Sequence, residues 1–317
     1  MRPYALPAIA PYRLDLTVSA LRRLSTNIVD LFTPEGIYVR ALAGIDGPVV
    51  VRVAQIAGTP SLSVAIEGGA RNDDAVLALV GRMLGVDVDL RKFYRRAAKV
   101  PWLAPLVERM RGVKPPRYPS LWEACVNAIV FQQISLQAAT AVMHRLTTSI
   151  GRPLRADDVP VPLYSFPDAE SVRRATDLRL RSAGLSANKI ATLRRVAEAL
   201  SSGALDESVL ARCTSQDAAA ILCRIKGIGP WTATIILLRG LGRLDVFPAG
   251  DSSVATNVAF VAGPEPLDVP RVVDDLGPQR GMLYFHLLLA RLDARAELGR
   301  ASFEPHSLET TVRARKS

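Results

Sequence analysis

The sequence predicts an α+β protein in which a mixed α/β domain at residues 1–98 precedes an all-α domain at residues 99–317. The chain has 317 residues, of which 49% are hydrophobic, so it can bury a large core and fold as more than one domain. Strand patterns occur only before residue 68, and helical patterns dominate from residue 121 onward. These observations together predict sheet first and helices later.

The N-terminal domain combines strand and helix patterns. Alternating or β-branched residues bounded by Pro and Gly predict strands at residues 12–16, 36–53 and 61–67. Helical spacing predicts helices at residues 20–31 and 72–84, and the second begins at an Asx residue typical of an N-cap. We therefore expect a two-layer α/β structure.

The boundary between the domains is expected near residues 90–118. A basic segment at 91–96 has a helical pattern, and the proline-rich segment 113–119 predicts a connector. Beyond it the pattern is helical throughout. The predicted helices are 121–150, 168–181, 187–201, 216–225, 230–239, 271–276 and 281–298, followed by a polar, basic tail at 301–317.

The charge of the chain favours a polyanionic partner. A net charge of +10 and a pI near 9.9 suit nucleic acid, because each Lys or Arg that meets a phosphate releases condensed counterions. An anionic membrane surface would also fit. Apolar runs such as 282–290 are far shorter than the roughly 20 residues needed to span a bilayer, and residues 1–20 lack a signal-peptide core. We expect a cytoplasmic protein, associated with the nucleoid if the source is bacterial.

The cysteines indicate neither a disulfide framework nor a metal site. Cys125, Cys213 and Cys223 are an odd number at long spacings. An iron–sulfur cluster needs four closely placed thiolates, which this chain cannot supply. We expect no metal ligands and no cofactor.

The most informative segment is the glycine pair near residue 228. An apolar segment at 218–225 can form a helix, Gly227 and Gly229 permit a tight turn, and Pro230 suits the first position of a new helix. The N–H groups at such a helix start bind phosphate oxygens without reading sequence. The segment therefore predicts a helix-hairpin-helix, although a lone G-x-G can also just shape a loop.

The residues after the hairpin narrow the choice of family. They follow the order Trp231, Thr232, Leu238-Arg239-Gly240, Asp245-Val246-Phe247 and Asp251. This order resembles the DNA-3-methyladenine glycosylase II family, enzymes of base-excision repair. The segments 131–135 and 183–190 resemble it too, as does the whole of 118–295. More weakly, residues 11–18 resemble the family's opening strand.

The resemblance implies the organisation of the helical domain. The family's fold has two helical subdomains with the active-site cleft between them. Here these are residues 121–243, which carry the hairpin, and residues 99–120 with 244–300.

The resemblance implies that Asp251 is the catalytic residue. A carboxylate beside the sugar stabilises the oxocarbenium character that develops during glycosidic cleavage. The alternative is that Asp251 is only the N-cap of a following helix. A second candidate, Asp245, precedes apolar residues and is more typical of a capping group.

One carboxylate is enough if the substrate is an alkylated purine. Such a base is cationic and leaves neutral, so a general acid is dispensable. Related enzymes that also cut the strand place a nucleophilic lysine where this chain has Trp231, and Lys226 lies before the hairpin. The resemblance therefore implies a monofunctional enzyme.

The base pocket is expected at Trp231, Ile235 and Leu288. The resemblance places the indole against the everted base, where its electron-rich face attracts a cation, although a buried aromatic can also be a simple core anchor. Ile235, Leu288 and Ala20 stand where well-known members have aromatic residues. We expect a less aromatic pocket, which leaves the substrate range open: the enzyme could rely more on the instability of the damaged bond than on stacking, or accept a different lesion.

Phosphate binding is expected at Gly227, Gly229 and Thr232, with the Thr232 hydroxyl either on the phosphate or capping the helix. A residue that fills the gap left by a flipped nucleotide is expected at Gln133 or Ile134. The alternative for Gln133 is a polar residue at a helix bend.

Arg239, His286 and a group of surface arginines are given structural roles. Arg239 is expected to neutralise a helix C-terminus or pair with an acid, and His286 to be a core histidine. The arginines at 173, 174, 179, 181, 194 and 195 are expected to form mostly a solvated face, in part a DNA-tracking one.

The predicted function is excision of alkylated purines, of the 3-methyladenine and 7-methylguanine type, from double-stranded DNA to leave an abasic site. Two alternatives stay open: the same fold acting on uracil, hypoxanthine or oxidised guanine, and a non-catalytic lesion-binding protein. The partner is damaged duplex DNA. We expect a monomer with no obligate protein partner, and the resemblance leaves open a monovalent cation at the hairpin when DNA is bound.

Overall fold

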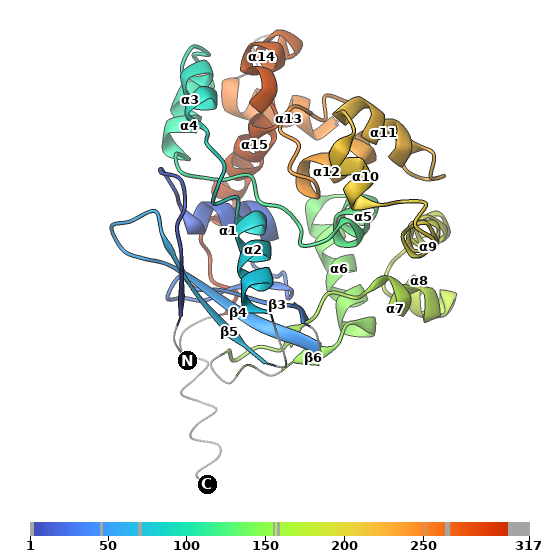
Figure 1. Ribbon diagram of the computed structural model, residues 1–317. Coiled ribbons are helices and arrows are strands. Elements are labelled where there is room, and N and C mark those ends of the chain that lie inside the picture. Colours follow the sequence, from blue (N-terminus) through green and yellow to red (C-terminus); the bar gives the residue numbers. More distant parts are fainter. Residues whose placement is uncertain are drawn as a thin grey trace.

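A five-stranded antiparallel sheet and a larger helical part make up the molecule (Figure 1). The computed structural model describes residues 3–44, 47–68, 72–154, 156, 159–250, 252–263 and 267–303. Neighbouring strands follow the order β1-β5-β4-β3-β2. Their bounds are β1 Tyr4–Leu6, β2 Asp30–Phe32, β3 Tyr38–Gly44, β4 Gly47–Gln55 and β5 Leu62–Glu67. The α+β class predicted from the sequence is confirmed.

One face of the sheet packs on a large apolar core, and the other face is buried by a smaller cluster only at β2, β3 and part of β4. Val49, Val51 and Val53 of β4 face the core that also contains α2 (Asp73–Leu84). Val50 faces the other way, toward a small cluster with Val159 and residues of β3. The predicted strand at 36–53 is thus two strands, β3 and β4, which pair antiparallel with Arg40 opposite Val51.

Helix α2 is the N-terminal element that the sequence predicts most accurately. Its N-cap is Asn72, whose side chain accepts a hydrogen bond from the Ala75 N–H at 3.1 Å. The basic segment at 91–96 also forms the expected helix, α3 (Arg91–Ala97).

Two predictions near the N-terminus are wrong. Residues 12–16 do not form a strand, and the likeness of residues 11–18 to an opening strand fails, because α1 spans Leu14–Arg22. This helix lies between two cores, with Val18 facing one and Leu16 facing the other. Apolar residues on both sides of a buried helix imitate the alternation of a strand.

The predicted helix at 20–31 is also wrong. Helix α1 stops at Arg22, and Arg23 adopts a positive φ of 67°. The chain then turns, and Asp30–Phe32 pairs with β3 as β2. Tertiary pairing overrides the local helical spacing here.

The helical part contains shorter helices than the sequence pattern predicts. The 121–150 segment breaks at residues 131–135, where Ser135 caps α6, and the 168–181 segment breaks at extended Ala175. The short helix α10 and the strands β6 (Pro153–Leu154) and β7 (Leu163–Tyr164) were not predicted. The helices are α4 Ala104–Arg109, α5 Leu121–Val130, α6 Leu136–Ile150, α7 Ala169–Arg174, α8 Asp177–Ser182, α9 Ala187–Ser201, α10 Glu207–Arg212, α11 Ser215–Cys223, α12 Pro230–Arg239, α13 Ser252–Ala262, α14 Val269–Leu276, the 3-10 helix η1 Gly277–Gln279 and α15 Met282–Asp293.

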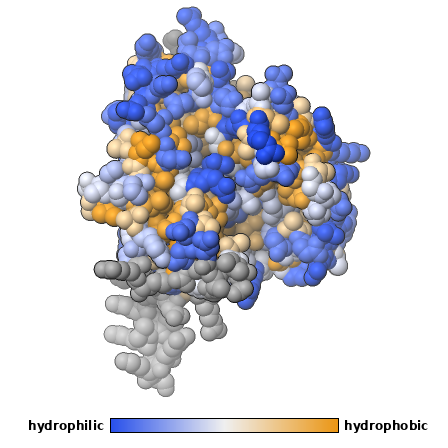
Figure 2. All heavy atoms as spheres, viewed as in Figure 1, coloured by the Kyte–Doolittle hydropathy of each residue, from blue (hydrophilic) through white to orange (hydrophobic). Residues whose placement is uncertain are grey.

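The molecule has two large apolar cores. Each core contains residues from both predicted domains. The first joins the sheet and α2 to helices α5–α12, and the second joins α1 to α3, α4 and α13–α15. The boundary near residue 98 stays a prediction. In the view of Figure 2, hydrophilic residues gather over the end formed by α3, α4 and α14. Among the described residues, no helix is long and apolar enough to cross a membrane.

Candidate active site

The predicted hairpin is residues 224–229, between α11 and α12. Gly227 has φ of +104°, and a Cβ added there would overlap the side chain of Thr192 on α9. Gly229 is extended and is the N-cap of α12, and a Cβ on it would meet open space. Pro230 begins the helix, and no side chain caps this helix end. The two glycines therefore serve different purposes: one permits the turn and the other leaves the helix start accessible.

Next to the hairpin lies a cavity of about 1210 Å³. It is bordered by the start of α12, by residues 131–137, by α9, by the start of α13 and by α15. Every predicted pocket, phosphate and wedge residue lines it: Gln133, Ile134, Gly227, Gly229, Trp231, Thr232, Ile235 and Leu288. Residues up to 155 positions apart in the sequence thus share one wall, but their roles stay predictions.

The apolar residues predicted for the pocket lie on α12 and α15. Ile235 is buried, one helical turn beyond half-buried Trp231, and Leu288 of α15 is half-buried. Ala20 does not belong to this wall. It is fully buried in the second core, and its carbonyl accepts a hydrogen bond from Arg239.

The cavity wall has more aromatic residues than the sequence analysis named, and whether the pocket is less aromatic than those of related enzymes stays a prediction. Phe131 and Tyr284 line the cavity together with Trp231. Tyr284 lies one helical turn before Leu288 on α15, a spacing that could have revealed it. Phe131 is the first residue of the segment that was predicted to supply the wedge residue, and the sequence gives no sign that its ring lines the cavity.

Arg23 joins these two aromatic residues on the cavity wall. Its guanidinium carbon lies 3.8 Å from the centre of the Phe131 ring, and Nη2 is 3.5 Å from the Tyr284 hydroxyl. Burial alone would raise the pKa of Tyr284, but the charges of Arg23 and Arg239 lower it below its ordinary value. The cavity therefore has a cationic, hydrogen-bonding edge that the sequence did not reveal.

Residues 131–135, hereafter the wedge turn, connect α5 to α6. Gln133 has a positive φ of 57°, and Gln133 and Ile134 are both exposed. Neighbouring Gln132, which the sequence did not single out, donates from Nε2 to the Thr232 Oγ1 at 2.7 Å. The Thr232 hydroxyl therefore accepts a hydrogen bond from the wedge turn. This contact differs from both roles predicted for Thr232, which were phosphate binding and helix capping.

Asp251 lies outside the residues that the structure describes. Its neighbours are Gly250, which lines the cavity, and Ser252, where α13 begins. The competing candidate, Asp245, is exposed and is not part of the cavity wall.

The described residues of the wall carry positive charge only. Arg23, Lys189, Arg291 and Arg295 line the cavity, and no Asp or Glu does so within the described part of the chain. In the same residues, no group of three or more His, Cys, Asp or Glu side chains could hold a metal ion.

The three structural assignments agree with the contacts. Arg239 donates to the carbonyls of Ala20 and Leu21 at the C-terminal end of α1. His286 is fully buried, with Nδ1 2.8 Å from the Met282 carbonyl oxygen. Ion pairs to acidic neighbours occupy several of the surface arginines, at Arg173, Arg174 and Arg194.

Comparison with known proteins was made against sequences and solved structures. A Mycobacterium tuberculosis protein named "Probable bifunctional transcriptional activator/DNA repair enzyme AlkA" is 32% identical over 172 residues, 54% of this chain and 33% of that protein. The Bacillus subtilis "DNA-3-methyladenine glycosylase" is 27% identical over 188 residues, 59% of this chain and 61% of that protein. This chain therefore spans a third of the first relative's length and less than two thirds of the second's.

A solved structure shares the fold over nearly the whole chain. The 3-methyladenine DNA-glycosylase from Archaeoglobus fulgidus aligns with a TM-score of 0.76 and 24% identity, covering 92% of this chain and 99% of that one. In addition, residues 126–287 match the family model for "HhH-GPD superfamily base excision DNA repair protein". That match spans half of the 317 residues, and the family resemblance predicted from the sequence is confirmed. The chain belongs to the HhH-GPD superfamily of base excision DNA repair proteins.

Proposed function

We propose that this protein is a monofunctional DNA glycosylase that removes alkylated purines from duplex DNA and leaves an abasic site. Family membership and the relatives named DNA-3-methyladenine glycosylase support the proposal. The observation that carries it is the cavity itself. One wall combines an uncapped helix start, an aromatic surface, an exposed turn and the residue that precedes Asp251.

DNA would be held at the hairpin. The N-terminal end of α12 carries the positive end of the helix dipole, and the empty space before Gly229 lets a phosphate approach its N–H groups. Arg291 of α15 and Arg295, two residues beyond the end of that helix, add positive charge along the same cavity. Such contacts bind the backbone and leave the choice of lesion to the pocket.

The everted base would lie against Trp231, with Ile235 and Leu288 beside it. A purine with a formal positive charge is attracted to the face of an indole more strongly than its neutral parent is. Phe131 and Tyr284 supply further aromatic surface on the same wall. The lesion range thus follows from aromatic contact together with the lability of the alkylated bond.

Asp251 would stabilise the sugar as the bond breaks. Its carboxylate opposes the positive charge that develops on the deoxyribose, the neutral base departs, and water adds to the sugar carbon. The single lysine among the described wall residues, Lys189, donates its ammonium hydrogens to two backbone carbonyls. This engagement supports hydrolysis without Schiff-base formation.

The decisive experiment measures base release from methylated duplex DNA by the wild type and by Asp251→Asn. We expect the variant to lose about 10²–10³-fold in rate, the usual effect of removing one electrostatic stabiliser of a transition state, while duplex affinity is retained. A binding-only protein would release no base in either form. Duplexes with uracil, hypoxanthine or oxidised guanine in place of the methylated base distinguish the other lesion classes.

We also propose that the protein acts as a monomer in the cytoplasm without an obligate protein partner. Light scattering of the purified chain, alone and with duplex DNA, measures the stoichiometry, and a 2:1 complex on a single lesion would contradict the proposal.

A further inference from the structure

The wedge turn holds a backbone conformation that its own exposed residues do not explain. Gln133 has a φ of 57°, a region that non-glycine residues enter at a cost of about 1 kcal/mol or more. Its side chain is exposed, as is that of Ile134. The surroundings must therefore fix this turn, because such conformations persist only where neighbouring contacts over-determine them.

Lys189 supplies the first of these contacts. It comes from the first turn of α9, and its Nζ donates to the carbonyls of Val130 at 2.8 Å and Gln132 at 3.0 Å. Val130 is the last residue of α5, so its carbonyl has no partner within the helix. Burial lowers the pKa of Lys189, and the two carbonyls are the acceptors that the structure gives its ammonium group. One side chain thus fixes both the end of α5 and the start of the turn.

Gln132 supplies the second contact, between the turn and the hairpin. Its Nε2 donates to the carbonyl of Gly227 at 3.0 Å and to the hydroxyl of Thr232 at 2.7 Å. Gly227 belongs to the hairpin and Thr232 to the first turn of α12. A single amide group therefore connects the wedge turn to both parts of the phosphate-binding element.

Helix α9 closes this set of contacts. Thr192, one turn after Lys189, packs against Gly227, where a Cβ would overlap it. The wedge turn, the hairpin and α9 thus contact one another pairwise and line the same cavity. A displacement of the wedge turn relative to the hairpin would have to break either the Gln132 or the Lys189 contacts.

We infer that Gln132 and Lys189 are positioning residues that hold the wedge turn at a fixed place relative to the hairpin, so that gripping a phosphate sets where the wedge enters the duplex. The inference rests on the proposed function. Neither residue is assigned contact with the reacting atoms. Without them the protein would still bind DNA, but it would lose the fixed offset between phosphate and wedge that keeps a nucleotide out of the stack.

The test separates binding from eversion with two variants and matched controls. Gln132→Glu keeps the shape of the side chain but removes the amide donor, and Lys189→Met removes the ammonium group. Gln137→Glu adds the same charge to the same cavity wall. Arg194→Met removes another cation from α9, one that donates to the Ala175 carbonyl and pairs with Asp177.

Eversion is measured without chemistry on a duplex in which 2-aminopurine adjoins a tetrahydrofuran abasic-site analogue. Its fluorescence rises when the neighbouring nucleotide is unstacked, and anisotropy on the same duplex gives the affinity. We expect both positioning variants to bind within about twofold of their controls, while the fluorescence of the saturated complex falls toward that of free DNA. Base release from a paired lesion should fall at least about tenfold, and release from an unpaired, bulged lesion should fall much less, because its eversion is cheap.

The outcomes are distinct. Fluorescence equal to that of the controls would overturn the inference, as would equal losses on paired and bulged lesions. If a variant does not fold, as judged by its melting curve, Lys189→Arg decides: it must restore fluorescence because it keeps a donor for the two carbonyls. A wild type that releases no base from any lesion would overturn the proposed function, whereas the fluorescence result would still stand.

Discussion

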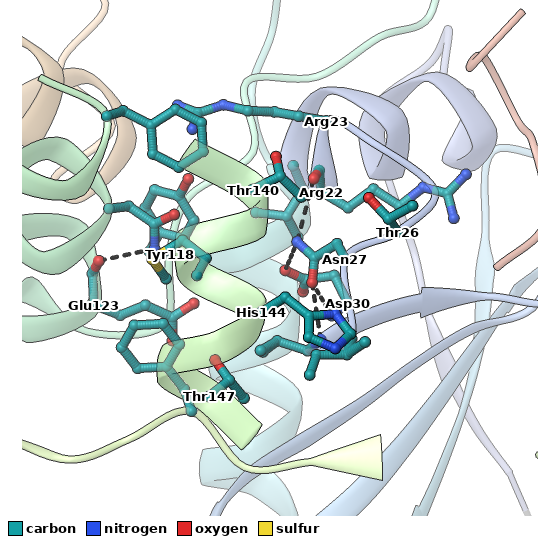
Figure 3. Close-up of a pocket in the computed structure, with 17 residues that line it drawn as sticks. Arg22, Arg23, Thr26, Asn27, Asp30, Tyr118, Glu123, Thr140, His144 and Thr147 are labelled. Carbon is teal, nitrogen blue, oxygen red and sulfur yellow. Dashed lines mark hydrogen bonds between the residues drawn. The ribbon is translucent and has the colours of Figure 1, made fainter. Parts of the chain in front are cut away.

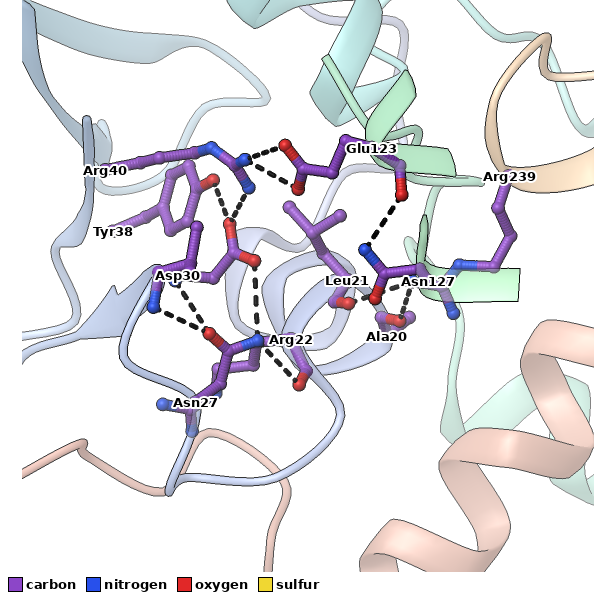
Figure 4. Close-up of polar contacts among 11 residues, drawn as sticks. Ala20, Leu21, Arg22, Asn27, Asp30, Tyr38, Arg40, Glu123, Asn127 and Arg239 are labelled. Atoms are coloured by element: carbon purple, nitrogen blue, oxygen red, sulfur yellow. Dashed lines mark hydrogen bonds and ion pairs between the residues drawn. The ribbon is translucent and has the colours of Figure 1, made fainter. Parts of the chain in front are cut away.

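Two regions of the molecule differ in how their charged side chains are arranged: the cavity beside the hairpin and the junction between the sheet and α5. At the junction, Arg40 is fully buried between Asp30 and Glu123, with N–O distances of 2.5 Å to each (Figure 4). In the cavity, the described wall carries four cations and no described acid. At the junction the opposite charges join elements of the fold, whereas the described side chains that line the cavity give it a positive potential.

The buried polar side chains at the junction bond to one another. The Tyr38 hydroxyl donates to Asp30 at 2.7 Å, and burial raises the pKa of Glu123 to about 7 despite the attraction of Arg40. The adjoining pocket, about 30 Å³, is lined by Asn27, Thr140 and other polar residues and has room for about one water molecule (Figure 3). In it the Asn27 amide donates to the Arg22 carbonyl and to the Asp30 carboxylate.

The largest expected effect comes from breaking the junction. Glu123→Ala leaves Arg40 buried with one acid in place of two, and we expect it to lower the free energy of unfolding by about 3–5 kcal/mol. Urea denaturation measures this loss. Base release per folded molecule should stay near that of the wild type, and a selective loss of activity would show that the junction belongs to the site.

A second buried group sharpens the comparison through pH. Burial lowers the pKa of His286 to about 4, from 6.5 in the unfolded chain. As pH falls, the unfolded state therefore takes up the proton before the folded state does. The contribution of neutral His286 to the free energy of unfolding is complete above pH 6.5 and decreases as pH falls toward 4. The total decrease is about 3 kcal/mol. The stability difference between wild type and His286→Leu should follow this curve. A difference that is flat between pH 4 and 6.5 would contradict it.

The hairpin glycines test the cavity side, and Gly227 should show the larger effect on stability. Gly227→Ala places a Cβ against Thr192 at a positive φ, so we expect a loss of about 1–3 kcal/mol in unfolding free energy. Thermal unfolding measures it. Loss of DNA affinity should accompany it, since the hairpin and Thr192 must move apart.

Gly229→Ala should give the smallest change in stability, about 0.5 kcal/mol or less, because the added Cβ meets open space and the backbone is extended. If a phosphate occupies that space, duplex affinity should nevertheless fall by about tenfold, measured by anisotropy at fixed salt. Unchanged affinity would place the phosphate elsewhere.

The local sequence predicted the structure best where a residue caps a helix or permits a turn. Asn72 and Pro230 begin helices as predicted, and the cavity gathers the residues named around the hairpin. These signals are short-range, because a cap or a glycine turn involves neighbours in the chain.

The remainder depended on contacts between distant segments. Helix α1 lies between two cores, so its apolar residues imitate a strand. Phe131, Tyr284 and Arg23 meet on one wall although they come from three separate elements. The side chains of Gln132 and Lys189 bond to backbone carbonyls of distant segments. Every residue has a backbone carbonyl, so the pattern of residue types cannot predict which one a side chain will contact.

Arg239 links the helical part of the chain to the N-terminal segment that ends near residue 98. Its guanidinium, at the end of α12, is fully buried and bonds to the carbonyls of Ala20 and Leu21. A version of the protein trimmed to its helices would retain this cation in an apolar interior and remove both oxygens that solvate it. The segment before residue 98 therefore supplies hydrogen-bond acceptors to the end of the helix that follows the hairpin, and deleting that segment would leave the Arg239 guanidinium without them.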